Sequence, residues 1–235
     1  MTEKTRIGIL KPGRAPEQLL AAQGDYDACF RRLLADEAFV FSTYDIENGA
    51  FPDGPTAADA WIITGSRHGV YEDHAWIAPL EQLIRDIRAA GRPLVGICFG
   101  HQIVAQALGG RVERAAGWIA GPQLYRDVDG NTFSINAWHR DQVVEPPPEA
   151  ELFATGEGCA FAGLRYPGPI LTLQPHPEFG SDYVLGLLAE RGSTLPEPLQ
   201  AHVGTANRRP PDLGYLVPLL KDALRADTAR NHAAA

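Results

Sequence analysis

Residues 96–102, Gly-Ile-Cys-Phe-Gly-His-Gln, constrain this chain more than any other stretch. The run Arg92–Val95 ahead of them predicts a buried strand, and Ile103–Leu108 behind them has helical spacing and ends at a glycine pair. Cys98 is therefore expected where a strand turns directly into a helix. At such a place the unpaired N–H groups and the positive end of the helix dipole lower the pKa of a thiol and can receive an oxyanion. We expect Cys98 to be a nucleophile rather than a core cysteine.

The chain has only three cysteines, and their number bounds its compartment. Three cannot form a disulfide framework, and an odd count indicates a reducing environment. Cys29 and Cys159 lack a comparable glycine-bracketed turn, so we expect both to be buried core residues. The first six residues lack the apolar run of a signal peptide, and no stretch approaches the ~20 apolar residues of a membrane span. These features predict a cytoplasmic protein that does not enter a membrane.

The charge balance argues against nucleic acid as a partner. Lys plus Arg number 21 and Asp plus Glu number 29, which gives a formal net charge of -8 over 235 residues. No basic cluster interrupts this acidic balance, as a nucleic-acid-binding surface would require. Nucleic acid is therefore not an expected partner.

Apolar runs alternate with helical patterns through the first part of the chain. Strands are expected at 7–10, 39–44, 61–63 and 92–95, and helices at 16–34, 75–90 and 103–108. Alternation of this kind predicts a parallel sheet with helices on both faces. In such sheets the ligand site lies at the carboxyl ends of the strands. Gly65 and Cys98 both fall at such ends.

The pattern changes after residue 110. Short strands are expected at 111–113, 123–126, 132–136, 152–154, 159–164 and 170–173, and helices at 181–190, 196–203 and 212–226. The sequence therefore predicts an α/β fold. Its expected form is an open, mostly parallel, flavodoxin-like sheet flanked by helices, with an antiparallel β extension and a helical C-terminus.

A nucleophilic thiol needs a general base, and the base needs an orienting group. His176 follows the expected strand 170–173 and stands in the segment Gln-Pro-His-Pro-Glu, residues 174–178. A residue before proline is pushed toward extended geometry, so His176 and Glu178 should point the same way. Glu178 could then hold one imidazole nitrogen and leave the other facing Cys98 at the same sheet edge. A plain surface loop is the alternative for this segment taken alone.

Seven histidines are present, but their spacing does not suggest a metal centre. His68, His74, His101, His139 and His176 have no CxxC partner and no HExxH spacing. We therefore expect no metal site and no cofactor.

Two motifs together resemble those of the class I glutamine amidotransferases. Residues 96–102 fit their G-x-C-x-G-x-Q signature, and residues 174–178 resemble their second, His-Pro-Glu signature. The resemblance covers roughly residues 6–190 and implies one domain over 1–235, with a helical extension at about 191–228. Because no P-loop or Rossmann glycine run appears, the chain resembles stand-alone members, close in character to the glutaminase domain of GMP synthetase.

The resemblance implies an enzyme with a Cys-His-Glu triad. Cys98 would attack a side-chain carboxamide and form a γ-glutamyl thioester, with His176 as base and acid and Glu178 orienting it. The backbone amides of Gly65 and Phe99 would form the oxyanion hole.

The resemblance also implies a set of substrate-binding residues. These are Ser66, Gln102, His139, Arg140 and Asp141, the last three in a segment, 138–143, that resembles the family's loop against the amino-acid end of glutamine. A surface turn is an equal alternative for that segment. Arg67 and His68 could reach the substrate carboxylate, and a solvated loop is the equal alternative.

Three functions follow for testing. The first is hydrolysis of the γ-carboxamide of glutamine or of a γ-glutamyl conjugate. The second is a regulatory or ammonia-supplying subunit that needs a separate synthetase. The third keeps the Cys–His chemistry on a different bond, as in a protease or a glyoxalase-like enzyme, and the His-Pro-Glu spacing argues against it.

Overall fold

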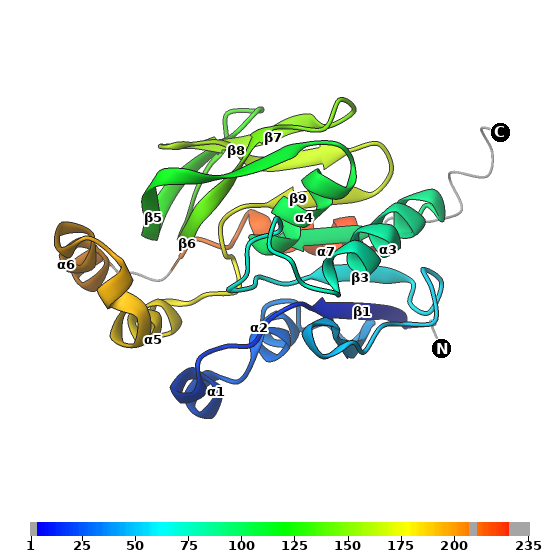
Figure 1. Cartoon of the computed structure of the whole chain (residues 1–235), viewed down its shortest axis with the longest axis horizontal. Helices are drawn as coiled ribbons and strands as arrows, with labels where there is room; N and C mark the ends of the chain where they lie inside the picture. The colour runs from blue at the N-terminus through cyan, green and yellow to red at the C-terminus, as the bar shows by residue number, and fades with distance from the viewer. Residues whose placement is uncertain (1–3, 207–210, 226–235) are drawn as a thin grey trace.

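The computed structural model describes residues 4–206 and 211–225, and in them nine strands form one sheet. The strands are β1 (Thr5–Lys11), β2 (Phe39–Asp45), β3 (Ala60–Ile63), β4 (Leu94–Ile97), β5 (Arg111–Asp127), β6 (Thr132–Glu145), β7 (Glu151–Gly156), β8 (Cys159–Tyr166) and β9 (Ile170–Leu173). The helices are α1 (Glu17–Gln23), α2 (Tyr26–Leu33), α3 (Ile77–Ala89), α4 (Phe99–Ala107), α5 (Ser181–Arg191), α6 (Glu197–Ala206) and α7 (Leu216–Arg225), with 3-10 turns η1 (Ile46–Asn48) and η2 (Gly192–Thr194). Figure 1 shows their arrangement.

The strand order is β2-β1-β3-β4-β9-β8-β7-β5-β6. The first five strands of this order are parallel neighbours. Their order corresponds to the 2-1-3-4-5 order of flavodoxin-like sheets, which places the ligand site at the carboxyl edge. The expected parallel α/β sheet is confirmed.

Helices cover both faces of the parallel strands. Successive side chains of a strand point to opposite faces, so each face carries apolar residues that a helix can bury. Trp61 and Ile63 of β3 pack with the buried apolar side of α3 and with α4. Ile62, between them in the sequence, packs on the opposite face with α2 and α7. In this second layer α7, a C-terminal helix, packs against β3, β4 and β9, the strands whose ends carry the candidate site.

The antiparallel extension is confirmed, but its first strands are longer than predicted. The segments expected at 111–113 and 123–126 are the two ends of one strand, β5, and the segment expected at 132–136 opens β6, which continues to Glu145. The pairing of β5 with β6 shifts register between Arg114 and Ile119. That bulge interrupts the alternation of apolar and polar side chains, so apolar periodicity did not reveal one continuous hairpin.

The prediction of a single helix over residues 16–34 is wrong. Gly24 adopts a φ of 79° and ends α1, and α2 starts two residues later. The Asp25 carboxylate accepts hydrogen bonds from the backbone N–H groups of Tyr26 and Ala15, both at 2.9 Å. An N-cap of this kind satisfies donors that an uninterrupted helix would not leave open, which explains the break.

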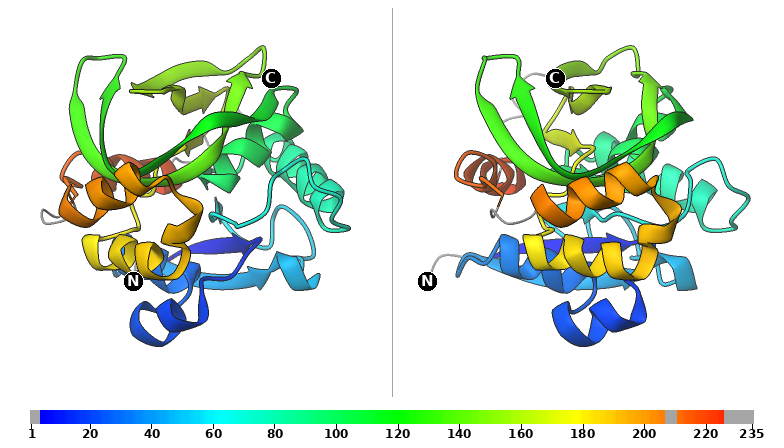
Figure 2. Two further views of the ribbon diagram at one scale, coloured as in Figure 1. Left: turned by 60° about the vertical axis from the view of Figure 1, so that its left-hand side comes forward. Right: turned by 90° about the vertical axis from the view of Figure 1, so that its left-hand side faces the viewer.

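Helices dominate the C-terminal part, as expected. Figure 2 shows α5 and α6 side by side beneath the β5–β6 hairpin, where they pack with Ala120 and Trp138. The helix expected at 212–226 begins later, at Leu216, and residue 226 lies outside the described residues. No helix within residues 4–206 and 211–225 is long and apolar enough to cross a bilayer.

Candidate active site

Cys98 lies between the end of β4 and the start of α4, as predicted. Its φ of 54° and ψ of -103° make it the single non-glycine residue with positive φ in the described part of the chain. The backbone N–H of Cys98 donates to the Leu173 carbonyl of β9 at 2.8 Å, which ties the turn to the neighbouring strand. This geometry is that of a nucleophile elbow.

The two glycines of the signature are required by packing. A Cβ on Gly100 would lie 2.3 Å from the Ile63 carbonyl oxygen, and one on Gly96 would lie 2.6 Å from the Gly100 carbonyl oxygen. Neither distance is compatible with a side chain. The glycines therefore let the start of α4 approach β3 and β4 closely enough to form the elbow.

His176 and Glu178 form a buried pair beside Cys98. His176 Nδ1 lies 2.7 Å from Glu178 Oε1, and the His176 backbone N–H donates to the Asn136 carbonyl at 2.8 Å. The Phe179 ring stacks on the imidazole, with centroids 4.0 Å apart and an interplanar angle of 5°. These contacts fix the ring, and the prediction that His176 and Glu178 point the same way is confirmed.

The electrostatics of the pair favour a charged imidazole. Burial lowers the pKa of His176, but the Glu178 carboxylate and the neighbouring Cys98 outweigh that effect and raise the pKa above its usual range. An imidazolium beside a thiol stabilises the thiolate form. The free nitrogen, Nε2, is buried and has no nitrogen or oxygen partner among the described residues. The arrangement can hold a thiolate next to a proton donor.

Gly65 completes the immediate surroundings of the thiol. A Cβ on Gly65 would lie 3.0 Å from His176 Cε1 and 3.9 Å from Cys98 Cβ. The backbone after β3 therefore passes directly beside both groups. Phe99 is the first residue of α4, a position whose N–H has no partner inside the helix.

A cavity of about 170 Å³ opens beside Cys98. All five residues predicted to bind substrate line it, with Arg67 and His68. The remaining lining residues are Arg114, Trp118, Trp138, Arg191 and Thr194. The structure therefore brings every predicted substrate residue to one cavity that contains the candidate nucleophile.

The structure corrects the expected environment of some of these residues. The segment 138–143 is not a loop or turn but part of strand β6. Gln102 Nε2 donates to the Asp141 carbonyl at 2.7 Å and to Gln174 Oε1 at 3.1 Å. Its amide N–H groups therefore make hydrogen bonds within the protein that link α4 to β6 and to the segment after β9. The Arg140 guanidinium donates to the carbonyls of Ala115 and Ala116 and so braces the bulge of β5.

His139 is a buried polar residue of the cavity, and its ring has no side-chain hydrogen-bond partner among the described residues. Its side chain is enclosed, while the backbone of Asp141 lies close enough to act on the pKa of the ring. Burial lowers its pKa to about 3, so the ring is neutral at pH 7. A neutral imidazole offers one donor and one acceptor to a bound molecule.

Sequence reasoning missed the outer wall of the cavity. Arg114 and Trp118 come from the bulged stretch of β5, and Arg191 and Thr194 come from the end of α5 and from η2. None of these residues stands in a recognisable motif, and the two pairs are far apart in the sequence. Only the folding of the hairpin over α5 brings them together.

Comparison with known proteins shows the family to which the chain belongs. A family model described as glutamine amidotransferase class-I matches residues 51–183. Gamma-glutamyl peptidase 4 of Arabidopsis thaliana is 29% identical over 185 residues, covering 70% of this chain and 72% of that protein. The glutamine-hydrolyzing GMP synthase of Thermus thermophilus is 39% identical over 127 residues, covering 51% of this chain but 24% of that protein.

A solved structure shows the same fold. The crystal structure of a glutamine amidotransferase from Methylobacillus flagellatus superimposes with a TM-score of 0.72 at 20% identity, covering 98% of this chain and 94% of that one. The predicted fold class and the predicted family resemblance are both confirmed. Because the family model spans more than half of its residues, the chain belongs to the class I glutamine amidotransferases and is an enzyme of the glutamine amidotransferase type.

Proposed function

We propose that the chain hydrolyses the γ-carboxamide of glutamine or of a γ-glutamyl conjugate through a thioester on Cys98. The observation that carries this proposal is the elbow cysteine lying beside His176, whose Nδ1 is 2.7 Å from Glu178 Oε1. Such an arrangement supplies a nucleophile, a proton carrier and an orienting carboxylate in one place.

The reaction takes two steps. The Cys98 thiolate attacks the γ-carbonyl carbon, the C–N bond breaks, and the His176 imidazolium gives its proton to the leaving amine or ammonia. A water molecule then attacks the thioester and passes a proton to His176. The C–S bond breaks, glutamate leaves, and the thiolate and imidazolium are restored. Glu178 stabilises the imidazolium in both steps without taking its proton.

The negative charge on the carbonyl oxygen needs donors during both steps. The N–H of Phe99 at the start of α4 and the N–H of Gly65 beside the triad are the proposed oxyanion hole. Removal of one such donor typically costs about 10²–10³ in kcat in other acyl-transfer enzymes.

The cavity wall supports a division between a glutamyl side and a leaving-group side. Ser66, Gln102, His139, Arg140 and Asp141 form the proposed glutamyl side, where the neutral His139 ring lacks a side-chain partner among the described residues. Its free donor and acceptor would meet the α-amino and α-carboxylate groups of the γ-glutamyl moiety.

The arginines of the cavity favour a leaving group that carries a carboxylate. Arg114 and Arg191 both line the cavity; Arg114 Nε lies 3.7 Å from Asp141 Oδ1, whereas the Arg191 guanidinium forms no ion pair with a carboxylate in the part of the chain that the structure describes. Trp118 beside them offers an apolar surface. A γ-glutamyl peptide, whose leaving group is an amino acid, fits these charges better than a γ-glutamyl polyamine, whose leaving group is cationic.

The alternative is an ammonia-supplying subunit that works with a separate synthetase. The match to GMP synthase, which covers 24% of that longer protein, favours this alternative. A subunit of this kind would be expected to release little glutamate on its own.

A glutamate-release assay on the isolated chain separates the two. The substrates are glutamine, γ-glutamyl dipeptides, glutathione and γ-glutamyl polyamine conjugates, with Cys98→Ser as the control. We expect Cys98-dependent release that is fastest with the peptides. Equal rates of glutamate release by the parent and Cys98→Ser would refute the thioester. No glutamate release from any substrate would favour the synthetase-dependent alternative.

The leaving-group side has its own variant. Arg191→Gln should raise KM for a γ-glutamyl dipeptide about tenfold, because a lost charged contact is worth roughly 1.5–3 kcal/mol. KM for glutamine, whose leaving group is ammonia, should stay within twofold. An equal rise for both substrates would assign Arg191 to the glutamyl side instead.

A further inference from the structure

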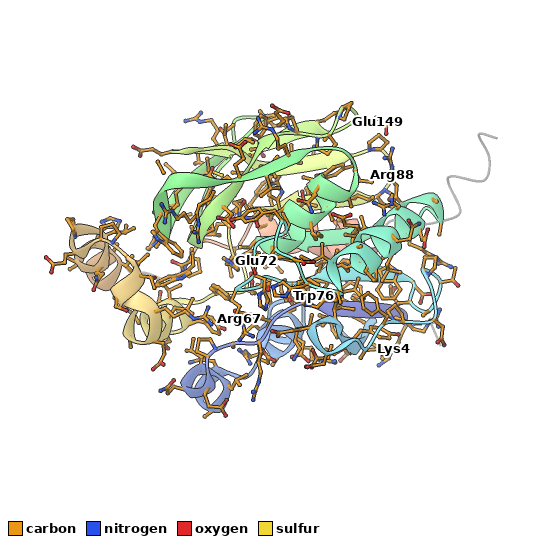
Figure 3. All side chains as sticks on the ribbon, viewed as in Figure 1. Lys4, Arg67, Glu72, Trp76, Arg88 and Glu149 are labelled. Atoms are coloured by element: carbon orange, nitrogen blue, oxygen red, sulfur yellow. The ribbon has the colours of Figure 1, made fainter. Side chains whose placement is uncertain are left out.

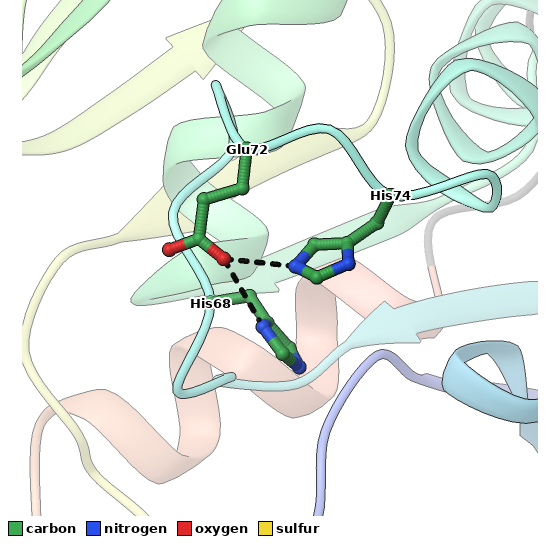
Figure 4. Close-up of side chains that lie close together, drawn as sticks. All are labelled: His68, Glu72 and His74. Atoms are coloured by element: carbon green, nitrogen blue, oxygen red, sulfur yellow. Dashed lines mark hydrogen bonds and ion pairs between the residues drawn. The ribbon is translucent and has the colours of Figure 1, made fainter.

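The connection from β3 to α3 gathers three side chains that could share one ion. Figure 4 shows His68, Glu72 and His74 turned toward one another on this connection. Glu72 Oε2 lies 3.2 Å from His68 Nδ1 and 2.8 Å from His74 Nε2. One ligand atom from each residue lies within 4.8 Å of the other two. None of the three is part of the Cys98 triad.

The donor count at His68 does not balance without a further positive charge. His68 Nδ1 faces Glu72 Oε2, while His68 Nε2 faces Glu47 Oε1 at 3.0 Å. Glu47 Oε1 also accepts a hydrogen bond from Arg67 at 2.7 Å. A neutral imidazole carries a single N–H, so both His68 contacts are favourable only if the ring gains a second proton or if a metal ion takes one nitrogen. A metal ion between Nδ1 and Glu72 would resolve the conflict, because Nε2–H could then donate to Glu47. A carboxylate on the far nitrogen is the usual outer partner of a metal-bound histidine.

The three side chains are held in place before any ion arrives. Glu72 Oε1 accepts a hydrogen bond from the Gly69 N–H at 2.9 Å, which leaves Oε2 for the imidazoles. The His74 ring stacks on Trp76, with centroids 5.5 Å apart and an interplanar angle of 6°. Trp76 in turn packs against Phe99, next to the nucleophile. Figure 3 labels Glu72 and Trp76 along this connection.

We propose that His68 Nδ1, Glu72 Oε2 and His74 Nε2 bind one divalent transition-metal ion of the zinc class, with Glu47 as the outer partner of His68. Two imidazoles and one carboxylate suit zinc, cobalt or nickel, whereas magnesium and calcium prefer an all-oxygen set. Three protein ligands leave a position for water. The spacing, His68-x3-Glu72-x-His74, matches neither HExxH nor CxxC, which is why motif reasoning passed over it.

The site would act on the cavity through the backbone. His68 lines the cavity beside Cys98, and its backbone N–H donates to Ser66 Oγ at 3.1 Å. A bound ion would therefore fix the segment that follows Gly65. The proposal does not depend on which γ-glutamyl compound the enzyme cleaves.

The test is metal binding measured directly, without an activity readout. Chelator-treated Cys98→Ser protein is titrated with Co²⁺ by visible absorption and with Zn²⁺ by calorimetry, so that the nucleophile cannot serve as a ligand. We expect one ion per chain. His74→Ala and Glu72→Gln, made in the same background, should each weaken binding at least about a hundredfold, and Glu47→Gln by about 10–100-fold, as loss of an outer partner does.

His202→Ala is the matched control, because His202 is an exposed histidine on α6 away from the cluster. It should bind the ion as the parent does. Thermal unfolding in the presence of chelator checks that all variants fold, and added Zn²⁺ should raise the Tm of the parent but not of His74→Ala. The proposal is overturned if the Cys98→Ser protein takes up no stoichiometric metal. It is also overturned if His74→Ala and Glu72→Gln bind as tightly as His202→Ala.

Discussion

At the scale of single residues, the backbone of Cys98 is the feature that sets the site apart. Its φ of 54° lies in the region that favours glycine, and no other non-glycine residue of the described chain adopts such a φ. Strain of this kind costs about 1–3 kcal/mol and persists at functional sites because the surrounding structure enforces it. A glycine at residue 98 would adopt this φ without strain, but it would have no thiol.

Two substitutions at Cys98 test this trade. Cys98→Ala and Cys98→Gly both remove the thiol, but only glycine relieves the positive φ. We expect Cys98→Gly to be more stable than Cys98→Ala by about 1 kcal/mol, measured by urea unfolding, with both inactive. Equal stability, or a more stable alanine variant, would show that the elbow stores no strain.

The positions of Cys98 and His176 at the ends of neighbouring strands could be predicted from the sequence because each residue sits in a local pattern. Glycines bracket Cys98, and prolines flank His176, so local rules already fix the direction of both backbones. The presence of Arg114 and Arg191 in one cavity could not be predicted, since no local rule places α5 beneath the hairpin. The same holds for Glu47 facing His68.

At the scale of elements, the contact between α4 and β3 positions the proposed nucleophile. A Cβ on Gly100 would overlap the Ile63 carbonyl oxygen, at 2.3 Å. That oxygen belongs to the backbone and cannot rotate away as a side chain could. The start of α4 would therefore have to move off the sheet, and the N–H of Phe99 would move with it.

Gly100→Ala should lower the free energy of unfolding by about 1–3 kcal/mol, the usual cost of overpacking a core. It should also lower kcat, because the proposed oxyanion donor is displaced. Gly54→Ala is the control, since a Cβ there meets nothing within 4 Å. Urea unfolding and glutamate release are measured on both. A Gly100→Ala protein as stable and as active as Gly54→Ala would contradict this account of the elbow.

The parallel sheet with helices on both faces could be predicted from the alternation of strands and helices, whereas the bounds of α1, α2 and β5 could not. The break at Gly24 depends on Asp25 capping α2 and binding the Ala15 N–H at the same time. The length of β5 depends on its pairing with β6 across a bulge. Both are set by contacts between separate segments, which periodicity within one segment does not report.

At the scale of the whole molecule, buried neutral histidines make stability depend on pH. Burial lowers the pKa of His101 to about 3, and it lowers that of His139 to about 3 as well. In the unfolded chain both rings regain a pKa near 6.5. Below that pH the unfolded state binds protons that the folded state does not, so acidification favours unfolding.

Between about pH 6.5 and 4.5, His101 and His139 should each lower the free energy of unfolding by roughly 1.4 kcal/mol per pH unit as the pH falls. His101→Asn, which can keep the contact to Thr172 Oγ1, should lose one such contribution and show a shallower slope. Urea unfolding at a series of pH values measures both slopes. Parallel slopes for the parent and His101→Asn would show that His101 is not held neutral.

The central claim is the covalent intermediate on Cys98, and trapping it is the most direct test. The protein is mixed with a γ-glutamyl dipeptide and quenched in acid within the first turnovers. It is then digested, and the mass of the peptide containing Cys98 is measured by mass spectrometry. The account predicts an adduct with the mass of one glutamyl group on Cys98 and none in Cys98→Ala, which should also release no glutamate. Glutamate release by Cys98→Ala at the parent's rate, with no adduct on the parent, would contradict it.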